Sequence, residues 1–248
     1  MSSILRVENL TKSYKGQRSP ALNNLSISIE KSQIFGLLGP NGAGKTTVVS
    51  ILTGLLKYKY GSIKIDANEL KNNRKHLKKK IGLVPQDIAL YPTLSARENL
   101  TYFGRIYGLQ GKNLHLEIDR YLRHFGLGAA ADNPVNTFSG GMKRRTNLIA
   151  GILHTPKLLF LDEPTVGIDV QSKTVILEYL KELNSNGTTI VYTSHDLSEA
   201  EQLCDYIAII DHGKKIAEGV PGQLLSQNSG ITDLEGLFLK LTGRALRD

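Results

Sequence analysis

Residues 39–46 read Gly-Pro-Asn-Gly-Ala-Gly-Lys-Thr and match the pattern G-x-x-x-x-G-K-[ST] of a phosphate-binding loop. The apolar run 34–38 before the loop predicts a strand buried on both faces. Apolar residues at helical spacing over 47–56 predict a helix directly after it. In this setting the glycines let backbone N–H groups surround phosphate oxygens, and the helix N-terminus adds the positive end of its dipole. A glycine-rich turn beside an exposed lysine is the weaker alternative, so we predict that the chain binds a nucleoside triphosphate.

The side chains of the loop have expected roles. In loops of this kind the Lys45 ammonium reaches the β- and γ-phosphates, and the Thr46 hydroxyl ligates Mg²⁺. Lys45 is therefore also a catalytic candidate. The residues expected to bind the nucleotide here are Gly39, Pro40, Asn41, Gly42, Ala43, Gly44, Lys45, Thr46 and Thr47.

The composition is typical of a folded chain from a reducing compartment. Hydrophobic residues make up 40% of the 248, and a single cysteine, Cys204, excludes an intrachain disulfide. No apolar run approaches the roughly 20 residues that span a bilayer, and the N-terminus lacks the apolar segment of a secretory signal. The 31 Lys and Arg outnumber the 23 Asp and Glu, for a net charge of +8. This charge favours an anionic partner: a nucleotide, a nucleic acid or an anionic lipid.

Alternation of apolar and polar residues predicts antiparallel strands. Segments 4–10 and 25–30 alternate as half-exposed strands do, and 62–66 is expected to join them in a small sheet. Segments 207–210 and 214–218 flank Asp-His-Gly, which is a hairpin signal.

Three further apolar runs, 81–84, 158–161 and 188–193, are typical of central parallel strands. A long helical pattern lies between the first two, and it begins with a capping box at 95–98. We therefore predict an α/β fold with an inserted helical subdomain.

Two more segments have clear patterns. Segment 233–241 predicts a last helix, and the strongly basic run 71–80 is expected to be a solvated surface. The apolar face of that helix is expected to consist of Leu234, Leu237, Phe238 and Leu241.

Polar residues follow the predicted parallel strands directly, at the edge where open α/β sheets bind ligands. Asp162 suits Mg²⁺ through water, and Glu163 is then free to orient or deprotonate the attacking water. The Gln86 amide can bind Mg²⁺ or donate to a phosphate, and His195 can hold the nucleophile and stabilise developing charge. The ordinary alternatives are an acidic turn, a loop glutamine and a structural histidine. The catalytic candidates are Lys45, Glu163 and His195, and the expected metal ligands are Thr46, Gln86 and Asp162.

Ser139, Gly140 and Gly141 form a second candidate anion site. Serine is a favoured N-cap, 142–153 has helical spacing, and two glycines allow close backbone approach to an anion. One nucleotide needs one phosphate loop, so this helix start is expected to serve a nucleotide held by another copy. A glycine-rich helix cap is the alternative that stays open.

Together these motifs resemble those of the ATP-binding subunits of ABC transporters. The resemblance implies a RecA-like P-loop core with an antiparallel β-subdomain and an inserted helical subdomain. It also implies that Tyr14 stacks on adenine and that head-to-tail subunits sandwich two ATP molecules, with each signature facing the Walker A motif of the other subunit. The matching motifs, in the family's order, are Walker A (39–46), the Q-loop (Gln86), the signature (138–142), Walker B (158–163), the D-loop (167–169) and the H-loop (His195).

The resemblance further implies a single ATPase domain, 1–248. About 1–85 and 156–220 would form the core and the β-subdomain, about 87–155 the helical subdomain, and 221–248 a C-terminal helical extension.

Segments 90–100, 138–145 and 241–244 are similar to those of ABC-2-type exporter ATPases, a group that includes drug-resistance and sodium-export systems. The signature departs from the usual form, with Met142 in place of glutamine and Phe138 in place of leucine. The resemblance implies a Mg-dependent ATPase that uses ATP to power a separate membrane permease. It implies a homodimer, or a dimer with a related ATPase subunit, on the cytoplasmic face of the membrane.

A soluble ABC ATPase acting on a ribosome, a nucleic acid or a cluster-assembly scaffold is the competing class. Relatives in that class usually have tandem ATPase domains, long coiled coils or zinc-binding cysteines, which this chain lacks, so a nucleic-acid partner is not expected. The apolar residues Leu90, Tyr91 and Leu94 are either local core or an exposed patch for a cytoplasmic helix of the permease.

Overall fold

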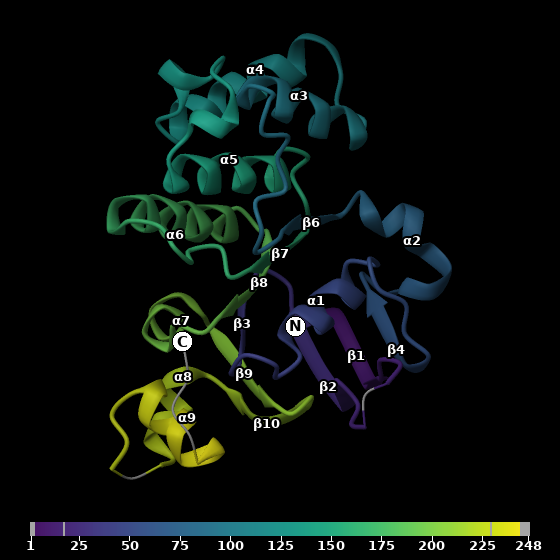
Figure 1. The fold of residues 1–248 in the computed structure, drawn as a ribbon. Coiled ribbons are helices and arrows are strands. Elements are labelled where there is room, and N and C mark those ends of the chain that lie inside the picture. Colours follow the sequence, from purple (N-terminus) through teal and green to yellow (C-terminus); the bar gives the residue numbers. More distant parts are fainter. Residues whose placement is uncertain (1–2, 17, 229, 244–248) are drawn as a thin grey trace.

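The centre of the fold is a six-stranded sheet whose strands come from distant parts of the chain (Figure 1). The computed structural model describes residues 3–16, 18–228 and 230–243. The strand order is β10-β9-β3-β8-β7-β6, and every neighbouring pair is parallel except β9 and β10. The strands are β3 (Ile34–Leu38), β6 (Ile81–Val84), β7 (Leu158–Asp162), β8 (Thr189–Ser194), β9 (Tyr206–Asp211) and β10 (Lys214–Gly219).

The predicted parallel strands and the hairpin are confirmed. Strand β7 shows why such runs are apolar throughout, because all five of its residues are buried. Leu158 and Phe160 pack in one hydrophobic core, whereas Leu159 and Leu161 pack in the core on the opposite face. The register sets Asp162 beside Thr193, so polar residues at the carboxyl ends of β7 and β8 are neighbours.

The predicted antiparallel sheet is also confirmed. Its order is β2-β1-β4-β5, and it buries its apolar face together with one face of the central sheet and with helix α1 (Lys45–Leu52). The short fourth strand was not predicted. The strands are β1 (Ser3–Lys12), β2 (Leu22–Glu30), β4 (Tyr60–Ile65) and β5 (Asn68–Glu69).

Helix α1 (Lys45–Leu52) follows the phosphate loop, but it starts and ends earlier than the predicted 47–56. It ends early because Thr53 caps it and Gly54 takes a positive φ of 77°, a conformation that glycine adopts readily. Helix α2 (Leu70–Lys78) was not predicted; it begins one residue before the basic run and covers most of it. That run is only partly a solvated surface, because Leu77 is fully buried.

The predicted helical region lies between β6 and β7 and gathers in the upper part of Figure 1. The capping box is confirmed: Ser95 Oγ accepts from the Glu98 N–H, and the Glu98 carboxylate accepts from the Ser95 N–H. The elements are α3 (Ala96–Ile106), α4 (Gly111–His124), the 3₁₀ turns η1 (Gly128–Ala130) and η2 (Val135–Thr137), and α5 (Gly140–Ile152).

The remaining helices are α6 (Val170–Ser185), α7 (Leu197–Leu203), α8 (Pro221–Ser226) and α9 (Leu234–Thr242). The predicted last helix is thus present, and three of its four apolar residues are buried, but Leu241 in the last turn is 39% exposed. Arg244 of the segment 241–244 and residues 245–248 of the expected extension lie outside the described residues. Among the helices of the described part, none has the length and apolar character needed to cross a membrane.

Removing the capping box should weaken the helical region measurably. We expect Ser95→Ala to lower the free energy of unfolding by about 1 kcal/mol, since an N-cap loss typically costs this much. Urea denaturation monitored by circular dichroism measures the change. The control is Ser185→Ala, whose hydroxyl lies at the exposed end of α6 and donates only to the Glu182 carbonyl. Equal losses in both variants would contradict the role of the cap.

Candidate nucleotide-binding and catalytic site

A cleft of about 830 Å³ lies over the phosphate loop, where the loop, the segment between β1 and β2 and the ends of β6 and β7 meet. Of the predicted site residues, Gly39, Ala43, Asp162, His195 and the signature residues are not part of its lining. Those that line it are Tyr14, Pro40, Asn41, Gly42, Gly44, Lys45, Thr46, Thr47, Gln86 and Glu163.

The glycines of the loop are required by its backbone. Gly42 and Gly44 have φ values of 80° and 108°, which residues with a side chain rarely adopt. At Gly39 a Cβ atom would lie 2.3 Å from the Ile210 carbonyl oxygen, so the loop can pass over β9 only without a side chain there. The loop can thus turn its N–H groups toward an anion above α1.

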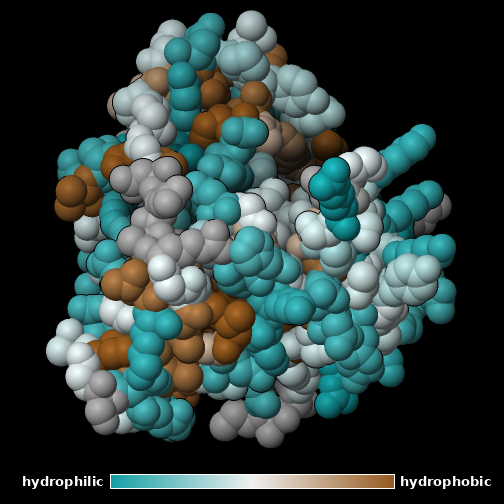
Figure 2. Space-filling view, turned by 60° about the horizontal axis from the view of Figure 1, so that its bottom comes forward, coloured by the Kyte–Doolittle hydropathy of each residue, from teal (hydrophilic) through white to brown (hydrophobic). Residues whose placement is uncertain are grey.

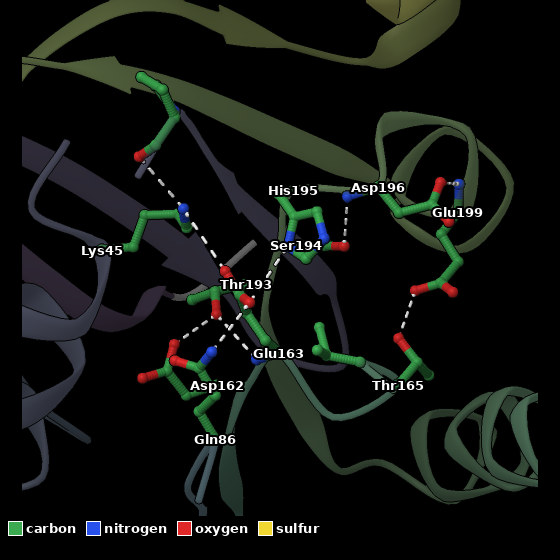
Figure 3. A network of polar contacts seen from close by, with 12 residues as sticks. Lys45, Gln86, Asp162, Glu163, Thr165, Thr193, Ser194, His195, Asp196 and Glu199 are labelled. Atoms are coloured by element: carbon green, nitrogen blue, oxygen red, sulfur yellow. Dashed lines mark hydrogen bonds and ion pairs between the residues drawn. The ribbon is translucent and has the colours of Figure 1, made fainter. Parts of the chain in front are cut away.

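Lys45 is buried at the base of the cleft, with 5% of its surface exposed. Its Nζ donates to the Gly39 carbonyl oxygen at 2.7 Å and lies 3.6 Å from Glu163 Oε1 (Figure 3). Burial lowers the pKa of Lys45, and the nearby carboxylates of Glu163 and Asp162 oppose that shift only in part. A phosphate group in the cleft would therefore meet an ammonium that has little solvation of its own.

Glu163 is where the predicted catalytic side chains meet. Its Oε2 lies 3.3 Å from Gln86 Nε2 and 3.1 Å from His195 Nδ1, while its Oε1 faces Lys45. The residue has a φ of 50°, in the left-handed region, and its N–H donates to Thr193. Backbone strain of this kind costs free energy and is held by surrounding contacts, as is common at functional sites.

Asp162 ends β7 and is 4% exposed. Its Oδ1 accepts a hydrogen bond of 2.7 Å from the Thr193 hydroxyl. The predicted ligands Thr46, Gln86 and Asp162 all offer oxygen, which suits Mg²⁺. The described residues contain no cluster of three or more His, Cys, Asp or Glu that could hold a metal. These ligands therefore fit a Mg²⁺ ion that also binds phosphate oxygens, not a metal held by the protein alone.

The signature residues lie apart from the cleft, at the start of α5. Ser139 is exposed and its Oγ accepts from the Met142 N–H at 3.3 Å. Gly141 is buried, and a Cβ there would lie 2.2 Å from Ser172 Oγ, so close packing against α6 requires glycine. The signature is therefore not placed on the nucleotide cleft of its own chain, and its predicted role across a dimer stays a prediction.

Tyr14 stands at the rim of the cleft, 38% exposed, with its hydroxyl 3.2 Å from Thr47 Oγ1. Its position above the phosphate loop leaves the ring accessible to a flat ligand. Stacking on adenine stays a prediction.

Three residues that support the site were not predicted. The Thr193 hydroxyl holds both acidic residues, as described above. The buried Arg144 donates to the carbonyl oxygens of Gln86 at 2.6 Å and Val166 at 3.2 Å, and so ties the Gln86 loop to the segment after Glu163. These contacts join distant segments, so no local sequence signal marks them.

Glu199 is the third of these residues, and it is 4% exposed. Its carboxylate accepts hydrogen bonds from the Tyr192 hydroxyl and from Thr165 Oγ1, and it pairs with Lys173. Figure 3 shows Glu199 and Thr165 on the far side of the His195 loop from Lys45. Glu199 thus fixes the segments that follow Glu163 and His195 against each other.

Comparisons with known proteins agree with this geometry. The chain is 46% identical over 232 residues to the linearmycin resistance ATP-binding protein LnrL of Bacillus subtilis, covering 94% of this chain and 74% of that protein. It is 38% identical over 235 residues to the Nod factor export ATP-binding protein I of Cupriavidus metallidurans, covering 95% and 77%. A family model described as ABC transporter matches 22–166, more than half of the chain. The chain belongs to the ABC transporter family, as one of its ATP-binding ATPases.

Solved structures show the same fold. An ATP-binding subunit of an ABC transporter superposes with a TM-score of 0.88 at 28% identity, covering 96% of this chain and 99% of that one. A dimeric ATP-binding cassette in a post-hydrolysis state, bound to ADP and Pi, superposes with a TM-score of 0.80 at 26% identity, covering 87% and 98%. The predicted RecA-like P-loop core is thereby confirmed.

The loop that follows His195 should make stability depend on pH. Partial burial of Asp196 raises its pKa, but hydrogen bonds from Ser198 and the Glu199 N–H, with the Lys173 ion pair, outweigh burial and lower the pKa to about 2. Ionised Asp196 therefore stabilises the folded state above its usual pKa of about 3.9, and this contribution is lost as the pH falls from about 4 to about 2.

We expect Asp196→Asn to be less stable than the wild type at neutral pH, with the difference shrinking as the pH falls through this window. Urea denaturation at several pH values measures it. The control is Glu178→Gln, an exposed carboxylate on α6, which should change stability little at any pH. A difference for Asp196→Asn that stays constant with pH would contradict the assignment.

Proposed function

We propose that this chain is the ATP-hydrolysing motor of an exporter, acting on a permease formed by a separate polypeptide. The observation that carries the proposal is the Glu163 carboxylate, which contacts Lys45, Gln86 and His195 at the edge of one cleft. Two relatives named for linearmycin resistance and for Nod factor export support the direction of transport.

In the proposed reaction, water attacks the γ-phosphorus and the bond to the oxygen bridging the β- and γ-phosphates breaks, giving ADP and phosphate. Glu163 accepts the proton of the attacking water. Lys45 exchanges its contact with the Gly39 carbonyl for phosphate oxygens, and His195 stabilises the charge that develops on the γ-phosphate. Mg²⁺ bound by Thr46, Gln86 and Asp162 would neutralise phosphate charge.

The second nucleotide contact comes from another subunit in this proposal. Ser139, Gly140 and Gly141 start a helix whose first N–H groups have no intrahelical partners. Because these residues do not line the cleft of their own chain, and Ser139 and Gly140 are exposed, this helix start is available to the nucleotide of a partner. The dimeric cassette among the similar structures supports this arrangement.

We propose the domain boundaries and the cellular location that membership of the ABC transporter family implies. We assign about 1–85 and 156–220 to the core and β-subdomain, about 87–155 to the helical subdomain and 221–248 to an extension. The chain is proposed to lie in the cytoplasm against the membrane that holds the permease, because its relatives are named as the ATP-binding proteins of transport systems.

Replacing the base should separate ATP binding from turnover. We expect Glu163→Gln to bind ATP but to lose about 10²–10³-fold in turnover, the usual cost of one transition-state group. With hydrolysis blocked, light scattering should show its mass doubling with Mg-ATP and returning with ADP.

The matched control is Lys45→Ala, which removes the positive charge opposite the β- and γ-phosphates. This variant should not bind ATP and should stay monomeric under the same conditions. Near-normal turnover in Glu163→Gln would show that Glu163 is not the base. A monomer at all concentrations with bound ATP would contradict the shared site for the isolated subunit.

The predicted permease patch is smaller than the sequence indicated. Leu90 and Leu94 are half-buried, and Leu90 packs against the core, whereas Tyr91 is 46% exposed and stacks edge-on against Tyr102. The Tyr91 N–H donates to the buried Asn99 side chain at 2.7 Å, so the backbone of the loop is fixed. We propose this rigid, exposed tyrosine pair as a contact for a cytoplasmic segment of the permease.

Tyr91→Asp should leave the ATPase of the isolated chain largely unchanged, because the side chain points away from the core. It should weaken co-purification with the permease and abolish transport, since it puts a charge into an apolar contact. Leu116→Asp is the control, because Leu116 is similarly exposed (54%) but lies on α4. Normal transport by Tyr91→Asp would place the contact elsewhere.

A further inference from the structure

Arg144 is a buried charged residue to which the proposed reaction assigns no part. Charged side chains usually lie at the surface, and much of the face drawn in Figure 2 is hydrophilic. Arg144, by contrast, is only 7% exposed. In the part of the chain that the structure describes, buried Lys45 and Glu163 pair with each other and buried Glu199 pairs with Lys173, but Arg144 has no ion pair.

The surroundings of Arg144 make its burial costly. Burial lowers the pKa of Arg144, and the nearby carboxylates of Asp87 and Glu163 oppose that shift only in part. Its Nε–H has no hydrogen-bond partner, and a buried unpaired donor costs free energy. Because apolar side chains of similar volume often stabilise a buried position as well as a charge does, the value of this arginine lies in what its other two nitrogen atoms hold.

Those two nitrogen atoms hold two distant segments to helix α5. Nη1 donates to the Gln86 carbonyl oxygen at 2.6 Å, and Nη2 donates to the Val166 carbonyl oxygen at 3.2 Å. Gln86 follows β6 and lines the nucleotide cleft, while Val166 follows Glu163 after the end of β7. One planar side chain therefore fixes both segments relative to α5.

Asn147 holds the same loop one turn further along α5. It is 3% exposed, its Nδ2 donates to the Pro85 carbonyl oxygen at 3.4 Å, and its Oδ1 accepts from the Ala89 N–H at 3.2 Å. Residues three apart on a helix lie on the same face. Arg144 and Asn147 thus form one polar clamp on segment 85–89.

The start of α5 is fixed close to this clamp. The signature residues Ser139 to Gly141 precede Arg144 by only about 5 to 8 Å along the helix axis. At Gly141 a Cβ atom would lie 2.9 Å from Asp169 Oδ2, so the segment from Val166 to Asp169 follows the first turns of α5. Arg144 therefore lies between Gln86 at the cleft of its own chain and the helix start that the proposed dimer offers to the nucleotide of the partner.

We infer that Arg144 is a positioning residue that couples the two nucleotide sites of the dimer. This inference rests on the proposed function, because it needs a site shared between two subunits. Arg144 carries the position of Gln86, set by the nucleotide in one cleft, to Ser139 and Gly141, which contact the nucleotide of the partner. Donors that are held in place before they meet their ligand bind it more tightly, since less freedom is lost on binding.

The test uses the full chain with Glu163→Gln as the parent and adds Arg144→Lys. A lysine keeps the charge but lacks the planar fork that spans the two carbonyl oxygens. The double variant should bind ATP like the parent, because the phosphate loop is unchanged. Light scattering with Mg-ATP should show that its dimer forms only at about tenfold or more higher protein concentration, since one hydrogen bond from a charged donor contributes at least about this factor.

Hydrogen exchange followed by mass spectrometry tests the clamp without any dimer. In Arg144→Lys the amides of segments 85–89 and 166–169 should exchange faster than in the wild type, because both segments lose an anchor. The second variant, Asn147→Ala, loses contacts with the loop alone. It should speed up exchange in 85–89 but not in 166–169.

The matched control is Arg97→Gln in the same parent. Arg97 also joins distant segments, since its guanidinium pairs with Asp119 and Asp132, but all three residues lie in the helical region. The control should keep the ATP affinity and the dimerisation of the parent and the wild-type exchange of both segments.

Four results would overturn the inference. They are dimerisation of the Arg144→Lys variant at the parent's concentration, an equal loss of dimerisation in the control, a loss of ATP affinity as large as the loss of dimerisation, and unchanged exchange of the two segments. A parent that stays monomeric with bound ATP would instead contradict the proposed function, and this inference would fall with it.

Discussion

The buried contact between Lys45 and Glu163 is the interaction around which the site is organised. Each side chain is less than one-tenth exposed, and a buried charge without a partner costs several kcal/mol. Each of these two charges has the other as its partner of opposite sign. The phosphate loop and the end of β7 must therefore keep their relative positions. Gln86 and His195 complete the shell around the same carboxylate, so four segments of the chain are fixed by one group.

The central sheet makes this contact possible. Strands β3, β8, β7 and β6 are parallel neighbours, so their carboxyl ends meet at one edge. The strained φ of Glu163 turns its side chain out of β7, and the N–H bond to Thr193 on the adjacent strand holds that turn. The same hydroxyl of Thr193 also holds Asp162. A strand register shifted by one residue would separate all of these groups.

The sequence predicted those parts of the molecule whose signal is local. The phosphate loop, the parallel strands and the capping box at Ser95 each depend on residues that are neighbours in the chain. Helix α2 was missed because its buried residues, Leu70 and Leu77, stand among lysines that hide the apolar periodicity. The Glu199 contacts were missed for another reason. They join Thr165, Lys173 and Tyr192 only after the sheet has formed, and no spacing in the sequence records them.

Two elements connect the nucleotide cleft with a second cleft of about 370 Å³. Helix α1 begins at Lys45 and runs for eight residues, about 12 Å, before Thr53 and Leu55 line the second cleft beside Lys78 and Lys79. Strand β6 also extends between the two clefts. Ile81, at its start, lines the second cleft, and Gln86, just beyond its end, lines the nucleotide cleft.

Both elements are regular secondary structure packed in a core, and neither contains a break between its two ends. Packed elements of this kind move as units, so a displacement of Lys45 or Gln86 is carried to the second cleft and not absorbed along the way. The phosphate loop therefore constrains more than ATP binding, because the helix that follows it ends beside the second cleft.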